Sequence, residues 1–125
     1  MINMKKILIV EDEDSLRKAL VERFKAEEFE VLEAVDGEEG LASAEKNNPD
    51  MIMLDIIMPK MDGITMLKKL RATEFGKDVP VMIMTNIDDA KNLYDGLANG
   101  AFDFLIKSNW GIGDMVEKVK NKLAS

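Results

Sequence analysis

The feature that most constrains this chain is a regular alternation between short apolar runs and longer stretches of helical periodicity. The apolar runs lie at residues 7–10, 29–34, 51–54, 81–84 and 101–106. Short continuous runs of this kind are typical of strands that are buried on both faces of a sheet. Each is followed by apolar residues spaced three or four apart, as in an amphipathic helix. The alternation predicts an α/β fold, a doubly wound five-stranded parallel sheet with helices on both faces.

Polar, glycine and proline signals place the ends of the expected helices. The first helix has the stripe Leu16, Leu20 and Phe24, and Asp14 or Ser15 can cap its start. The later boundaries are indicated by Asp36-Gly37, Asn47-Asn48-Pro49, Asp62-Gly63, Pro80, Asp88 and Asn99-Gly100. The connections are short, and a chain of 125 residues has no room for a second core. We therefore expect residues 1–125 to form a single domain.

Composition limits the chemistry that is open to the chain. It contains neither cysteine nor histidine, which excludes disulfides, thiol nucleophiles and imidazole bases. Any bound metal should therefore be a hard cation with oxygen ligands. The net charge of −7 argues against direct binding to nucleic acid or to an anionic membrane surface. The first apolar run is too short for a signal peptide or a membrane span, so a cytoplasmic location is expected.

Polar side chains follow four of the expected strands. Glu11 and Asp12 follow the first strand, Asp55 the third, Thr85 the fourth and Lys107 the fifth. Open α/β sheets bind ligands beyond the carboxyl ends of their strands, at the point where the strand order reverses. If the order is 2-1-3-4-5, these four strands are contiguous and the five residues face one crevice.

The chemistry of this set is that of a metal-assisted carboxylate. Two like unit charges ~4 Å apart repel by roughly 4 kcal/mol at an effective dielectric near 20. Lys107 can offset one charge, and Mg²⁺ or Mn²⁺ can offset two by taking oxygen ligands from Glu11, Asp12 and Asp55. Asp55 is then a candidate nucleophile for aspartyl-phosphate chemistry, assisted by Lys107 and Thr85. Taken singly, acids near a helix start or a lysine at a strand end also have purely structural interpretations.

A resemblance to a known family rests on four segments: 7–12 (ILIVED), 49–63 with DIIMPKMDG at its end, 81–85 (VMIMT) and 100–107 (GAFDFLIK). With these segments, residues 4–123 resemble the receiver domain of two-component response regulators, the chemotaxis-type phosphoacceptor family. The resemblance implies a flavodoxin-like (βα)5 sandwich with strand order 2-1-3-4-5.

The family's roles carry over by position. The resemblance implies that Asp55 is phosphorylated, with Thr85 as switch hydroxyl and Lys107 as phosphoryl-binding lysine. It implies metal ligation by Glu11, Asp12, Asp55 and the backbone carbonyl of Ile57. Phe104 stands where the family often has an aromatic switch residue. Phosphorylation would then repack the surface formed by the fourth helix, the fifth strand and the fifth helix, which is a two-state population shift.

The resemblance also implies partners. Because the chain has no histidine, its phosphoryl donor should be a separate histidine kinase or histidine phosphotransfer protein. The chain is expected to be a stand-alone receiver that signals by binding a downstream protein or passes the phosphoryl group on. It is not expected to turn over external substrates as an enzyme does.

Three departures from the family pattern change these expectations. Ser108 replaces a proline that usually follows a cis bond, so the Lys107–Ser108 peptide should be trans or strained. Asn86 replaces a small residue and puts side-chain access to the switch in doubt. Ile57 and Ile87 are apolar where polar groups often position the hydrolytic water. We therefore expect slow autodephosphorylation.

Three other functions remain open. A degenerate receiver would act only as a protein-interaction module. A haloacid-dehalogenase-like phosphatase would place a second aspartate two residues after its nucleophile, where this chain has Ile57. A flavodoxin-like cofactor binder would need a hydroxyl- and glycine-rich loop after the first strand, where this chain has acids that repel phosphate.

Overall fold

The computed structural model describes residues 4–86, 90–101 and 103–124. Within these residues, five parallel strands form one sheet in the order β2-β1-β3-β4-β5, so the predicted doubly wound topology is confirmed. The strands are β1 (Lys6–Val10), β2 (Glu30–Ala34), β3 (Met51–Asp55), β4 (Val81–Thr85) and β5 (Asp103–Ile106).

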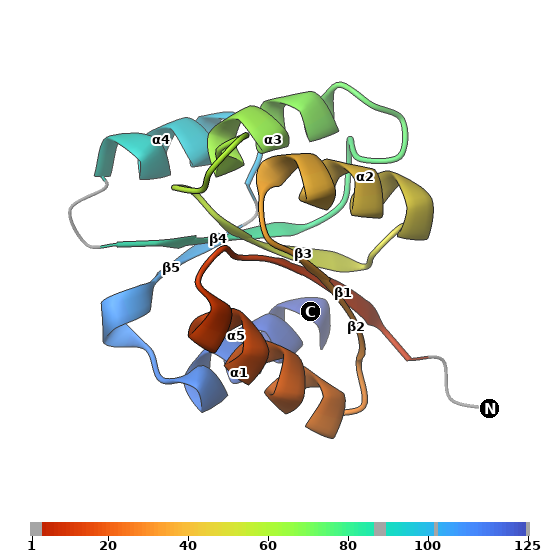
Figure 1. Cartoon of the computed structure of the whole chain (residues 1–125), viewed down its shortest axis with the longest axis vertical. Coiled ribbons are helices and arrows are strands. Elements are labelled where there is room, and N and C mark those ends of the chain that lie inside the picture. Colours follow the sequence, from red (N-terminus) through yellow and green to blue (C-terminus); the bar gives the residue numbers. More distant parts are fainter. Residues whose placement is uncertain (1–3, 87–89, 102, 125) are drawn as a thin grey trace.

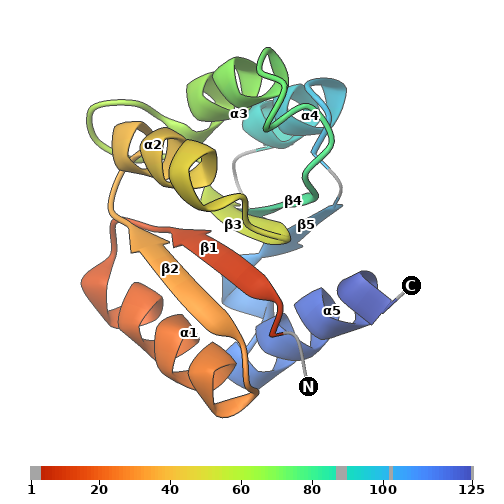
Figure 2. The ribbon, with the colours of Figure 1, turned by 90° about the vertical axis from the view of Figure 1, so that its right-hand side faces the viewer.

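Helices cover both faces of the sheet. In Figure 1 and Figure 2, α1 and α5 lie on one face, whereas α2, α3 and α4 lie on the other. Their bounds are α1 (Asp14–Ala26), α2 (Gly37–Asn47), α3 (Gly63–Arg71), α4 (Ala90–Ala98) and α5 (Ile112–Ala124). A short 3-10 helix (Lys107–Asn109) links β5 to α5. Among the described residues, none of the helices combines the length and apolar character that a membrane span requires.

The two faces of the sheet bury separate cores. Successive side chains of a strand point to opposite faces, so Ile7 and Ile9 pack in the core with α1 and α5, whereas Leu8 packs in the core with α2 and α3. The same alternation runs through β3 and β4, where every residue is buried. This is why these strands read as continuous apolar runs and not as alternating ones.

The strand register brings the carboxyl ends of four strands to one edge. Val10 lies opposite Leu54, so Glu11 follows β1 at the level of Asp55. Asp55 in turn lies opposite Met84, and Thr85 lies opposite Ile106. The predicted site residues on or just after these strands therefore share one end of the sheet.

The prediction that Asp14 or Ser15 caps the first helix was wrong. Glu13 is the N-cap of α1, and no side chain makes a capping hydrogen bond there. Asp14 is already the first residue of the helix, and its carboxylate accepts a hydrogen bond from Arg17 at 2.7 Å. The capping role predicted for Asp88 lies outside the described residues.

Two strand starts also differ from the prediction. β2 begins at Glu30, because Phe29 donates its N–H to the Phe24 carbonyl at the end of α1 and its ring packs edge-on against Phe24. β5 begins at Asp103, because the Ala101 N–H bonds to Gly96 and closes the end of α4. In both cases a hydrogen bond to the preceding helix takes an apolar residue out of the strand.

Candidate functional site

Three carboxylates meet at the carboxyl edge of the sheet. Glu11 and Asp12 lie in the loop between β1 and α1, and Asp55 is the last residue of β3. One carboxylate oxygen from each lies within 4.8 Å of the others. Glu11 and Asp55 are buried, whereas Asp12 is exposed. The structure therefore brings together the three acidic side chains that the sequence predicted as metal ligands, and we call this group the acid cluster.

Lys107 enters the acid cluster from the end of β5. Its Nζ lies 2.8 Å from Oε1 of Glu11 and 3.1 Å from Oδ2 of Asp55. Lys107 is the first residue of the 3-10 helix that follows β5. None of the peptide bonds in the described part of the chain is cis, so the bond between Lys107 and Ser108 is trans.

The electrostatics of the cluster are unbalanced. Burial and the charge of Glu11 raise the pKa of Asp55 to about 7, and Lys107 opposes that shift only in part. Burial lowers the pKa of Lys107, but the proximity of Glu11 and Asp55 outweighs it, and the net pKa lies above the ordinary value. Lys107 therefore stays protonated at neutral pH. One ammonium group faces two buried carboxyl groups, which leaves a deficit of positive charge.

The atoms of the cluster fit a hard divalent cation. Oε1 of Glu11 is buried and accepts no hydrogen bond from the described residues, although the Lys107 ammonium group lies 2.8 Å away. Oε2 of Glu11 accepts the Glu13 N–H, and Oδ1 of Asp55 accepts the Ile56 N–H. Carboxylate oxygens are the ligands that such cations take, and the exposed Asp12 opens the cluster to solvent.

Thr85 and Phe104 lie on β4 and β5 and are not members of the acid cluster. Thr85 is buried at the end of β4, and its hydroxyl donates to the Asn86 carbonyl at 3.3 Å. In the described part of the chain no hydrogen bond joins Thr85 to Asp55. Phe104 on β5 lies opposite Ile83 and packs, partly buried, against the core under α2, α3 and α4. Their switch roles stay predictions.

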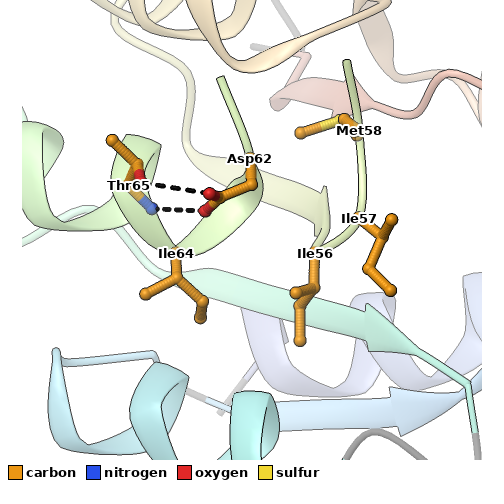
Figure 3. Close-up of a pocket in the computed structure, with 6 residues that line it drawn as sticks. All are labelled: Ile56, Ile57, Met58, Asp62, Ile64 and Thr65. Atoms are coloured by element: carbon orange, nitrogen blue, oxygen red, sulfur yellow. Dashed lines mark hydrogen bonds between the residues drawn. The ribbon is translucent and has the colours of Figure 1, made fainter. Parts of the chain in front are cut away.

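A hollow lies along the loop between β3 and α3, which begins directly after Asp55. It has a volume of about 330 Å³, and Ile57, which is 61% exposed, lies on its wall (Figure 3). The carboxylate on this wall, Asp62, is already engaged, because it caps α3 by accepting from the N–H and the hydroxyl of Thr65. The Ile57 carbonyl stays a predicted metal ligand. Ile87 lies outside the described residues.

Two residues that were not predicted to belong to the site help to hold the acid cluster in place. Gly63 was interpreted as a turn signal, but a Cβ at this position would clash with the carbonyl oxygen of Asp55. Arg17 was not singled out, yet it is buried and donates to the backbone carbonyl of Glu11. Its position in the sequence could have indicated this role, because a charged residue on the buried face of α1, beside Leu20 and Phe24, needs polar partners.

Comparisons with known proteins agree with this geometry. The family model of the response regulator receiver domain matches residues 7–120. The alkaline phosphatase synthesis transcriptional regulatory protein PhoP of Bacillus subtilis is 39% identical over 103 residues, which cover 82% of this chain and 42% of that protein. The regulator RpaA of Synechocystis is 33% identical over 117 residues, which cover 94% of this chain and 48% of RpaA. The chain thus spans less than half the length of these curated relatives.

A solved structure has the same architecture over nearly the whole chain. The CheY-like receiver domain protein of Methanospirillum hungatei superposes with a TM-score of 0.89 at 28% identity, covering 98% of this chain and 95% of that one. The family match spans far more than half of the sequence and includes the acid cluster and Lys107. The chain therefore belongs to the family of response regulator receiver domains, which are signalling modules phosphorylated by histidine kinases.

Proposed function

We propose that this chain, residues 1–125, acts as one phosphoacceptor unit that receives a phosphoryl group on Asp55 with the help of Mg²⁺ or Mn²⁺. The observation that carries the proposal is the placement of the Asp55 carboxylate. It is buried, it lies 3.1 Å from the Lys107 ammonium group, and it belongs to a cluster of three carboxylates. A carboxylate so placed has a counterion for the incoming phosphoryl oxygens and ligands for a metal beside it.

The proposed step is a transfer from a phosphohistidine on a donor protein. A carboxylate oxygen of Asp55 attacks phosphorus and forms a P–O bond. The P–N bond breaks, and the imidazole nitrogen of the donor keeps the electron pair. Lys107 stabilises the negative charge of the phosphoryl oxygens. A bound Mg²⁺ would supply further neutralisation through Glu11, Asp12, Asp55 and the Ile57 carbonyl.

The output would be a change of surface. Thr85 is buried at the end of β4, just before the segment that leads to α4, and among the described residues its hydroxyl donates a long, 3.3 Å hydrogen bond to the neighbouring Asn86 carbonyl. A phosphoryl group on Asp55 would offer this hydroxyl a stronger, charged acceptor. We propose that Thr85 then turns toward Asp55, that Phe104 moves inward, and that the α4–β5–α5 surface binds a downstream protein.

Phosphorylation by a small donor tests the proposal directly. The protein is incubated with acetyl phosphate and MgCl₂, and its intact mass is measured. We expect an increment of one phosphoryl group in the wild type and in Asp50→Asn, which alters an exposed aspartate at the opposite end of β3. Asp55→Asn should show none. An increment that persists in Asp55→Asn would move the acceptor elsewhere, and a chain that no donor phosphorylates would be a module that only binds partners.

A further inference from the structure

Arg17 is a buried cation near the start of α1, where it contacts the backbone of Glu11. Its three donor nitrogens reach three different segments. Nη1 donates to the backbone carbonyl of Glu11 at 3.0 Å, Nη2 to Asp14 at 2.7 Å, and Nε to Glu33 on β2 at 3.1 Å. The planar guanidinium group makes such a fixed three-way arrangement possible, whereas a lysine ammonium group does not.

We infer that Arg17 is a positioning residue that holds the loop between β1 and α1 so that the Glu11 and Asp12 carboxylates stand ready for a divalent cation. The inference rests on the proposed metal binding of the acid cluster. Arg17 contacts the backbone of Glu11 and leaves its carboxylate to Lys107. It therefore orients the cluster without competing with a cation for it.

The backbone of Glu11 is held from both sides. Its N–H donates to the Ala34 carbonyl at the end of β2, and its carbonyl accepts from Arg17. Glu33 precedes Ala34 in β2, so Arg17 and Ala34 together clamp the end of β1 to the end of β2. Without Arg17 the carbonyl would lose its buried partner, and the loop that carries both carboxylates would lose one of its two anchors.

Because Arg17 is positively charged, its positioning role and its charge have opposite effects on cation affinity. Removing a positive charge near a cation site should, by Coulomb's law alone, tighten cation binding. Removing an anchor of the ligand loop should weaken it. The two effects have opposite signs, so the direction of change in affinity decides between them. A merely structural role would lower the stability of the protein and leave the affinity of the folded protein unchanged.

The test is the affinity for Mn²⁺ alone, measured by the loss of the free-ion electron paramagnetic resonance signal. The variants are Arg17→Met, Arg17→Lys and a control, Arg23→Met. Arg23 lies on the same helix, is half exposed and pairs with Glu27 near the far end of α1. We expect both Arg17 variants to weaken Mn²⁺ binding about 10-fold or more, as loss of a partner that orients metal ligands does. Arg23→Met should bind like the wild type.

Circular dichroism and urea unfolding establish which variants are folded at the temperature of the titration. If Arg17→Met does not fold, Arg17→Lys decides, because it keeps the charge and loses the three-way donor geometry. Unchanged or tighter Mn²⁺ binding by a folded Arg17 variant would overturn the inference. A wild type that neither binds Mn²⁺ nor accepts a phosphoryl group would instead overturn the proposed function. The two failures are therefore distinguishable.

Discussion

The buried carboxyl group of Asp55 should make the metal-free protein less stable as the pH rises. Its pKa is raised from the ordinary 3.8 to about 7 by burial and by the charge of Glu11. Between these two values the folded protein holds a proton that the unfolded chain has released. The free energy of unfolding must then fall with pH across this window, by about 1.4 kcal/mol per pH unit and about 4 kcal/mol in total.

Asp55→Asn removes this dependence, because an amide does not ionise. The variant should therefore gain stability relative to the wild type as the pH rises. Most of the window lies between pH 5 and pH 8, so we expect the difference in unfolding free energy to grow by about 3 kcal/mol over that range. The gain should level off above pH 7, where the wild-type carboxyl group is ionised in both states.

Urea unfolding in EDTA, followed by circular dichroism at several pH values, measures this difference. Asp50→Asn, which removes an exposed carboxylate, is the matched control. Adding Mg²⁺ at pH 8 should restore stability to the wild type, by about 2.7 kcal/mol at 100 times its dissociation constant, and less to Asp55→Asn. Parallel stability curves for the wild type and Asp55→Asn between pH 5 and pH 8 would refute the reasoning.

Three further changes test other parts of the site. Lys107→Met leaves the buried Glu11 without its counterion and should lower the free energy of urea unfolding by about 3 kcal/mol at pH 7; an unchanged midpoint would contradict this. Gly63→Ala places a Cβ against the Asp55 carbonyl and should lower the free energy of unfolding by about 2 kcal/mol. Thermal unfolding measures this loss, and an unchanged melting temperature would contradict it. Ile57→Asn adds a polar group that can hold water beside Asp55 and should speed loss of the phosphoryl group about tenfold. The decay of the phosphorylated mass measures this rate, with Ile57→Val as control, and equal rates would rule out a role for the apolar side chain.

Much of the fold followed from local pattern. The β3 and β4 runs are apolar throughout because both of their faces are covered, so their sequences identify them as inner strands. The starts of β2 and β5 were less predictable. Phe29 has the residue type of a strand, but a hydrogen bond to Phe24 keeps it in the turn after α1. Such a bond depends on where the helix ends in space, and the pattern of apolar residues along the sequence does not predict that position.

The acid cluster was predictable to a similar extent. Parallel strands bring their carboxyl ends to one edge, so residues that follow different strands could be placed together from the sequence. The sequence did not distinguish Glu11 from its neighbour Asp12, although one is fully buried and the other exposed. Adjacent side chains at a strand end point in different directions, and only the packing around them decides which one meets Lys107.

The sequence by itself determined the architecture, the edge of the sheet where chemistry can occur and the kinds of residue available there. These properties depend on the order of apolar runs and on which residues follow them, and both can be read along the chain. The tertiary structure alone decided the balance of charge in the acid cluster and the anchoring of its loop. Both depend on contacts between distant segments: Lys107 reaches Glu11 and Asp55 from β5, and Arg17 links α1 to β2. Burial then sets the strength of those contacts, because the same charges interact far more weakly in water.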